Sequence, residues 1–101
     1  HTLIFDEIDA GISGAIADRV GNTFEKLSAS HQILCVTHLS QIAGKGCHHY
    51  RVKKKSVNNR IVTQVNKLSK SERIIEIASL ISGKEITDVS RKQAKIMLHH
   101  G

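Results

Sequence analysis

Two groups of polar residues follow apolar runs in this chain, and their side-chain types suit phosphate chemistry. Asp6, Glu7 and Asp9 come directly after the run TLIF, and His38 comes after the run ILCVT. One carboxylate at such a place can hold Mg²⁺, often through water. A second carboxylate can orient or deprotonate an attacking water, and a histidine can donate a hydrogen bond to a phosphate. The set indicates transfer of a phosphoryl group to water. A solvated turn is the plainer alternative, above all for Asp9.

The elements around these residues should place them at one edge of a sheet. Residues 2–5 and 32–37 are short apolar runs, typical of strands buried on both faces in a parallel sheet. A helix is expected between them, over about residues 14–28, with Ser13 as its N-cap. The order strand, helix, strand predicts a parallel crossover unit, and ligands bind beyond the carboxyl ends of such strands. The acidic group and the histidine both lie at such ends.

A β-hairpin and a helix are predicted next. Residues 48–55 and 60–68 look extended, and Asn58-Asn59 between them is typical of a turn. The run Ser69-Lys70-Ser71-Glu72 has the spacing of a capping box, which predicts the start of a helix that Gly83 ends.

The last helix is expected to start at Thr87 or Asp88 and to run to about residue 99. We expect its inner side to carry four residues at helical spacing, Val89, Gln93, Ile96 and Met97. The predicted fold class is therefore α/β: parallel strands with a crossover helix, then a β-hairpin and two C-terminal helices.

Composition and charge limit the kinds of partner. The chain has 101 residues, which is about one small domain, and a formal net charge of +6, which favours an anionic partner such as nucleic acid or nucleotide phosphate. The hairpin carries candidate DNA contacts at Lys53, Lys54, Lys55 and Arg60, although charge runs are commonly solvated and edge lysines also deter strand pairing. Two cysteines without CxxC spacing favour a reduced, cytoplasmic chain. No stretch approaches the ~20 apolar residues that span a membrane.

Several motifs together resemble one enzyme family. The stretches LIFDEIDAGISG (3–14), ILCVTHLSQIAG (33–44) and HHYRVKK (48–54) resemble the SMC-like branch of the ATP-binding-cassette ATPases, and within it a bacterial DNA-repair family. IIEIASLISGKEIT (74–87) and AKIML (94–98) extend the resemblance over nearly the whole chain. It implies part of a P-loop NTPase head that carries a Walker B strand, a D-loop and a switch histidine.

The resemblance also implies a role for each matching residue. Asp6 would hold Mg²⁺ through water, and Glu7 would polarise the attacking water. His38 matches the switch histidine. Asp9 and Ser13 would lie at the D-loop, which meets the opposite ATPase head in the family, although many cassette ATPases carry Asp where this chain has Ser13.

The family's cofactors and partners follow from the same resemblance. They are ATP and Mg²⁺ as cofactors, double-strand DNA ends, and a second copy that pairs through the ATPase heads. The expected location is the bacterial cytoplasm, in association with the nucleoid, and no membrane is implied.

Other family motifs do not occur in the sequence. We find no GxxxxGK[ST] phosphate loop, no LSGGE-like signature and no heptad run. In the family these lie upstream, and His1-Thr2 does not look like a natural start. We therefore expect residues 1–101 to form a single incomplete domain that cannot hydrolyse ATP alone.

Three alternatives stay open at this point. DEID resembles motif II of DExD-type helicases, but the next strand ends in Val-Thr-His and not in a Ser-Ala-Thr type motif. The hairpin over residues 48–68 could serve a non-enzymatic, basic DNA-binding module. Exposed strand edges could instead make the chain an interaction module that associates with itself.

Overall fold

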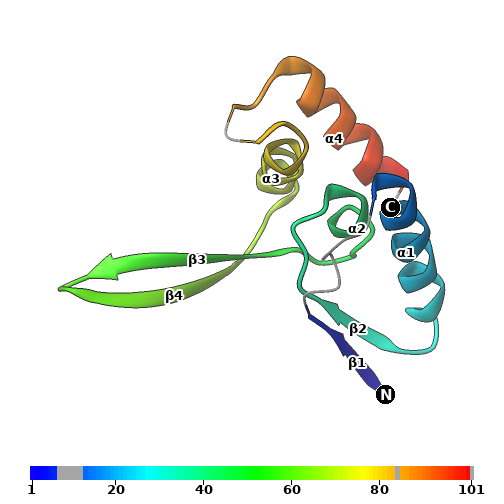
Figure 1. The fold of residues 1–101 in the computed structure, drawn as a ribbon, viewed down its shortest axis with the longest axis horizontal. Helices are drawn as coiled ribbons and strands as arrows, with labels where there is room; N and C mark the ends of the chain where they lie inside the picture. Colours follow the sequence, from blue (N-terminus) through cyan, green and yellow to red (C-terminus); the bar gives the residue numbers. More distant parts are fainter. Residues whose placement is uncertain (7–12, 84, 101) are drawn as a thin grey trace.

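The computed structural model describes residues 1–6, 13–83 and 85–100, and arranges them as an α/β chain with one projecting arm (Figure 1). The elements in order are β1 (Thr2–Phe5), α1 (Gly14–Leu27), β2 (Gln32–Cys35), α2 (Ser40–Ala43), β3 (Tyr50–Val57), β4 (Arg60–Lys67), α3 (Lys70–Ser82) and α4 (Asp88–His100). The predicted fold class is confirmed. The short helix α2 is an addition to the predicted elements.

The first half is the predicted parallel unit. β1 and β2 pair in parallel with Phe5 opposite Cys35, and α1 lies between them in the chain. The rings of Phe5 and Phe24 lie 4.5 Å apart between centroids, so α1 covers one face of the strand pair. The N–H of Val36 donates to the carbonyl of Phe5 at 2.9 Å, which continues the pairing past the end of β2.

The prediction that both strands are buried on both faces is wrong. Exposure alternates along each strand, and Ile4 and Val36 are 71% and 60% exposed. In the described part of the chain, only the face that carries Phe5 is covered. Because the strands are apolar at nearly every position, the sequence could not show which face would be open.

The second half begins with the arm, an antiparallel hairpin of β3 and β4 that extends away from the helices (Figure 1). Asn58 and Asn59 connect the strands with φ values of 50° and 63°. Positive φ at both central residues is typical of the type I′ turn, whose twist suits a two-residue hairpin. The predicted turn is confirmed, and the first strand lies two residues later than predicted.

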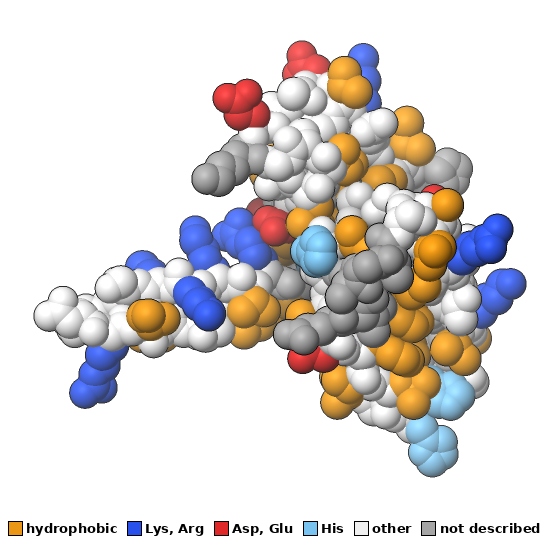
Figure 2. All heavy atoms as spheres, viewed as in Figure 1, with side chains coloured by type: hydrophobic (Ala, Val, Ile, Leu, Met, Phe, Trp, Pro, Cys, Tyr) orange, Lys and Arg blue, Asp and Glu red, His pale blue; other side chains and the backbone are white. Residues whose placement is uncertain are grey.

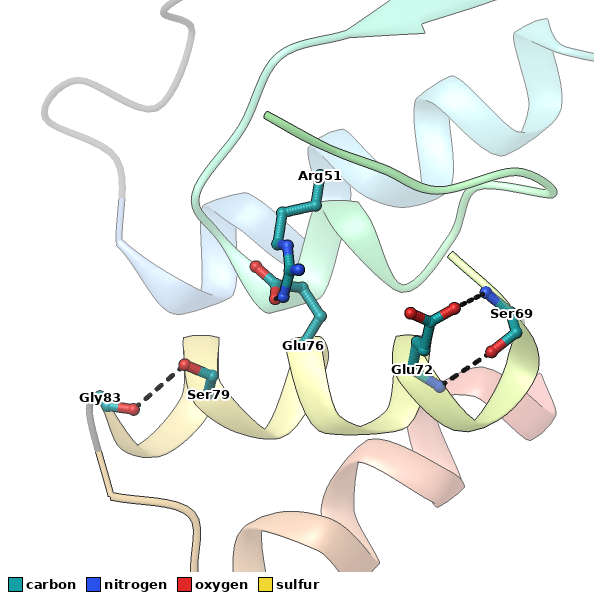
Figure 3. Close-up of polar contacts among 6 residues, drawn as sticks. All are labelled: Arg51, Ser69, Glu72, Glu76, Ser79 and Gly83. Carbon is teal, nitrogen blue, oxygen red and sulfur yellow. Dashed lines mark hydrogen bonds and ion pairs between the residues drawn. The ribbon is translucent and has the colours of Figure 1, made fainter. Parts of the chain in front are cut away.

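The helices α3 and α4 form the core with α2. Ile77, Ala78 and Ala94 are buried, and partly buried apolar side chains pack around them, including Ala43 of α2. The capping box of α3 is confirmed: the Ser69 N–H donates to Glu72 at 3.0 Å, and the Glu72 N–H donates to the Ser69 hydroxyl at 3.3 Å (Figure 3).

The predicted inner side of α4 is correct at only one of its four positions. Met97 packs against the core, but Val89, Gln93 and Ile96 are exposed, and Ser90 and Ala94 are buried in their place. Thr87 and Ser90 exchange bonds, from the Ser90 N–H to the Thr87 hydroxyl and from the Thr87 N–H to the Ser90 hydroxyl, each 3.0 Å long. These reciprocal bonds cap the start of α4.

Candidate functional site at the ends of β1 and β2

Two of the predicted site residues follow neighbouring strands. Asp6 comes directly after β1, and His38 comes three residues after the end of β2. The parallel pairing of Phe5 with Cys35 brings both strand ends to the same edge of the sheet. Both side chains are exposed at that edge.

The turn that carries His38 is fixed locally. The hydroxyl of Thr37 accepts a hydrogen bond from the N–H of Leu39 at 3.0 Å. This bond links the two residues that flank His38. The next residue, Ser40, is buried and begins α2. His38 therefore projects from a short turn that is held between β2 and a packed helix.

A cleft of about 670 Å³ lies beside His38, and all four helices contribute to it. Asp18 of α1, Gln41 of α2 and Gln93 of α4 line it with His38, and Leu80 and Met97 supply part of its apolar lining. Sequence reasoning did not assign these three polar residues to a site, because they come from separate elements that only the folded chain brings together. Asp6 is not among the described residues that line this cleft.

Ser13 takes the predicted position but not the predicted bond. It is the N-cap residue of α1, with φ −85° and ψ 168°, and its carbonyl accepts from the Ala17 N–H at 2.8 Å. Its hydroxyl makes no capping hydrogen bond, and the residue is exposed. The helix start is confirmed. The hydroxyl of Ser13 is not used to cap the helix.

The remaining predicted acids cannot be placed in the same way. Glu7 and Asp9 lie outside the described residues, and their proposed roles stay predictions.

The predicted basic residues lie on the arm. Lys53, Lys54 and Lys55 are on β3 and Arg60 begins β4, and all four are exposed. Because neighbouring residues of a strand point to opposite faces, Lys54 lies on the face opposite that of Lys53 and Lys55.

A partly buried cation that sequence reasoning missed connects α3 to the segment after His38. Arg73 donates to the carbonyl of Ala43 at 3.0 Å and also to the carbonyl of Gly46. Burial lowers the pKa of Arg73 below its usual value. The sequence held one indication of this role. Arg73 comes one helical turn before Ile77, and that spacing puts it beside the apolar stripe of α3.

Arg73 also affects a neighbouring histidine. Burial, followed by the positive charge of Arg73, lowers the pKa of His49 below 6.5, while Glu76 acts in the opposite direction. The neutral imidazole is therefore favoured in the folded chain.

The chain has similar proteins among those already known. No family model matches it. The chain is 46% identical over 97 residues to the DNA repair protein RecN of Haemophilus influenzae, and 39% identical over 97 residues to RecN of Bacillus subtilis; each match covers 96% of this chain and 17% of the relative. RecN of Rickettsia conorii is 45% identical over 98 residues, which are 97% of this chain and 18% of that protein.

The chain is homologous to a segment of RecN. The resemblance seen in its motifs is thereby confirmed. The chain spans less than one fifth of the length of these RecN relatives, since each match covers 17% or 18% of the relative.

The fold has a counterpart among solved structures. A structure from work on ATP-driven dimerization and DNA-stimulated activation of SMC ATPases matches with a TM-score of 0.67 at 23% identity, and the match covers 83% of this chain and 49% of that one. At this identity the match shows the fold alone, which this chain shares with part of that SMC ATPase structure. No helix in the described ranges is long and apolar enough to cross a membrane.

Proposed function

We propose that this chain acts as the C-terminal part of a RecN-type ATPase head that works in DNA double-strand break repair and recombination. One observation carries the proposal. Asp6 and His38 follow two strands that pair in parallel and in register, at the edge where such sheets bind their ligands. The homology to RecN supports the same assignment.

The described residues fit a magnesium ion that is shared with phosphates. Mg²⁺ commonly keeps several waters and binds one or two carboxylates together with substrate phosphates, and the exposed carboxylate of Asp6 is such a ligand. Within residues 1–6, 13–83 and 85–100 no group of three or more metal-binding side chains occurs, so these residues form no closed cage of ligands. When bound, Mg²⁺ would neutralise charge that develops on the phosphates.

The other site residues have separate tasks in this proposal. Glu7 orients the attacking water by accepting a hydrogen bond from it, and His38 donates a hydrogen bond to the terminal phosphate. Asp9 and Ser13 contact the opposite head of a homodimer, and the uncapped hydroxyl of Ser13 supports this role. These assignments rest on the motifs and on the positions of Asp6, Ser13 and His38.

The remaining parts of the ATP site would come from elsewhere in a longer protein. The chain lacks a phosphate-loop motif and spans less than a fifth of its RecN relatives. We therefore propose that residues 1–101 bind and hydrolyse no ATP by themselves. The complete protein would act on double-strand DNA ends in the bacterial cytoplasm, at the nucleoid.

The proposal is tested in a full-length RecN protein that carries this segment. ATP hydrolysis is measured with and without linear DNA for the wild type and Glu7→Gln. Turnover should fall by about a hundredfold or more in the variant, because general-base assistance contributes at least that much, while ATP binding is retained. Glu85→Gln is the control, since Glu85 is exposed between α3 and α4. Unchanged turnover in Glu7→Gln would remove Glu7 from the mechanism.

A non-enzymatic DNA-binding role is the second candidate, and the exposed basic arm favours it. It needs no ATP site. DNA binding by the 101-residue chain without ATP, together with no ATP turnover by the wild-type full-length protein, would favour it over the ATPase role.

A further inference from the structure

The arm formed by β3 and β4 has two faces of different chemistry. Cross-strand partners point to the same face, and so do residues two apart along a strand. The basic face therefore comprises four cross-strand pairs: Arg51 with Asn66, Lys53 with Gln64, Lys55 with Val62, and Val57 with Arg60. The apolar face comprises the other four: Tyr50 with Lys67, Val52 with Val65, Lys54 with Thr63, and Ser56 with Ile61.

Both faces are open to solvent in the described chain. Arg51 is the only arm residue that is partly buried, and even Val52 and Ile61 are 63% and 78% exposed. Figure 2 shows Lys and Arg side chains spread along the arm, beyond the rest of the molecule. Lys53, Lys55 and Arg60 of the basic face are therefore not occupied in packing.

The base of the arm is anchored to α3 and to the segment that precedes β3. Arg51 forms an ion pair with Glu76 of α3 at 3.6 Å (Figure 3). The N–H of Leu68 donates to the carbonyl of His49 at 2.9 Å, and Leu68 is buried. Beyond this anchor the basic face still presents Lys53, Lys55 and Arg60, and residues 50–67 contain no Asp or Glu to neutralise them.

We propose that the basic face of the arm binds the phosphate backbone of double-stranded nucleic acid without reading its sequence. Lys53 and Lys55 are two residues apart on one strand, which is about 6.8 Å. That distance is about twice the rise of 3.4 Å per nucleotide along one strand of duplex DNA. Gln64 and Asn66 on the same face carry amide donors, which also bind phosphate oxygens.

The same face argues for a duplex and against a single strand. Proteins that bind single strands stack bases on aromatic side chains. The basic face has none, and the arm's one aromatic residue, Tyr50, lies on the apolar face. A two-stranded ribbon is also narrow enough to lie along the major groove of a duplex.

A matched pair of double variants tests the proposal. Lys53→Glu/Lys55→Glu changes the basic face, and Lys54→Glu/Lys67→Glu makes the same change in net charge on the apolar face. Binding of the 101-residue chain to a blunt-ended DNA duplex of mixed sequence is measured by fluorescence anisotropy over a range of salt concentrations, without ATP or Mg²⁺. The first variant should bind about tenfold or more weakly and lower the salt slope by about two, because two phosphate contacts are lost. The second should bind nearly as well as the wild type.

Several results would overturn the proposal. Equal loss in both variants would mean that net charge alone sets the binding. Preference for a single strand of the same sequence would refute the duplex, and binding to vesicles of anionic lipid with no binding to the duplex would assign the face to a membrane surface. Circular dichroism checks that each variant is folded. If the short chain does not fold, the same binding measurement is made with both variants in full-length RecN. The ATPase proposal is judged separately, from turnover without DNA.

Discussion

The guanidinium of Arg73 donates a 3.0 Å hydrogen bond to the backbone carbonyl of Ala43, the last residue of α2. The same group also donates to the carbonyl of Gly46. One side chain of α3 thus donates to two carbonyls, one in the last residue of a four-residue helix and one three residues later. This contact joins the C-terminal helices to the segment that starts at His38.

Replacing Arg73 should therefore loosen the connection between the two halves. Arg73→Met keeps much of the apolar stem but removes both hydrogen bonds. The partly buried carbonyl of Ala43 then keeps only the Gly46 N–H at 3.4 Å, and the exposed carbonyl of Gly46 loses its guanidinium donor. We expect the free energy of unfolding to fall by about 2 kcal/mol, since bonds to charged groups contribute about that much. The midpoint of urea unfolding measures it. Arg91→Met, on the exposed side of α4, is the control and should change stability little; an equal loss there would contradict this role.

His49 should make stability depend on pH. Its pKa is lowered in the folded chain, by burial first and by Arg73 second. As the pH falls through about 6.5, the unfolded chain takes up a proton that the folded chain resists, so the stability present above that value is lost on acidification. Urea midpoints at about pH 8 and pH 5 measure the loss. It should shrink in His49→Gln and persist in His48→Gln, whose side chain is exposed; the same pH dependence in His49→Gln would refute the assignment.

Local patterns in the sequence predicted the elements well. The apolar runs, the N-cap at Ser13 and the box at Ser69 and Glu72 each act within a few residues, and the structure has each element where they indicated. The Asn58-Asn59 turn is equally local. Their positive φ values are a preference of asparagine that needs no tertiary contact.

Packing choices could not be predicted in this way. Two faces of α4 could have been buried, the one with Val89 and Ile96 or the one with Ser90 and Ala94. The structure buries Ser90 and Ala94. Small residues such as these contribute little to a hydrophobic pattern in the sequence. The four residues of α2 are too few to show a helical period. For the site, the edge that Asp6 and His38 share followed from the order of strands, whereas the cleft beside His38 needed the helices in place.

The contact of α1 with α2 leaves no room for a side chain at Gly21. A Cβ built there would lie 2.8 Å from the backbone oxygen of Gln41. Alanine would ordinarily favour the helix by about 1 kcal/mol, but a clash with backbone costs about 1–3 kcal/mol. We expect Gly21→Ala to destabilise the fold.

Gly14→Ala on the same helix is the comparison for Gly21. There a Cβ would meet only the side-chain amide of Gln41, at an ordinary 3.4 Å. We expect it to raise the free energy of unfolding by about 0.5 kcal/mol. Thermal unfolding midpoints of both variants are compared with that of the wild type. A stabilised Gly21→Ala would show that α1 and α2 can move apart freely.

The start of α3 should depend on Ser69. Ser69→Ala removes the acceptor for the Glu72 N–H and should cost about 1 kcal/mol, whereas Ser69→Asp keeps an acceptor and should retain most of the stability. Denaturant midpoints for both variants make the comparison. Equal loss in the two would mean that the hydroxyl matters for another reason.

Glu72, the partner of Ser69, should contribute stability that is lost in acid. The Ser69 backbone N–H, more than any other group, lowers the pKa of Glu72 below 4.5. The stability that ionised Glu72 contributes is therefore present above pH 4.5 and is lost as the pH falls through the pKa of the folded chain. Unfolding midpoints measured below about pH 5 should fall less steeply in Glu72→Gln, which keeps the capping geometry without a titrating carboxylate. An unaltered acid profile would assign the loss to other carboxylates.

Thr37 should position His38 for the proposed ATPase reaction. Its hydroxyl accepts from the Leu39 N–H across His38, so Thr37→Val keeps the shape of the side chain and releases the turn. In a full-length RecN protein we expect kcat to fall by about tenfold with little change in KM, because small displacements of a positioned group slow the chemical step more than binding. Thr37→Ser keeps the acceptor and should retain kcat. If Thr37→Val turned over like the wild type, the hydrogen bond would be a feature of the fold alone, and His38 would not need it to reach the phosphate.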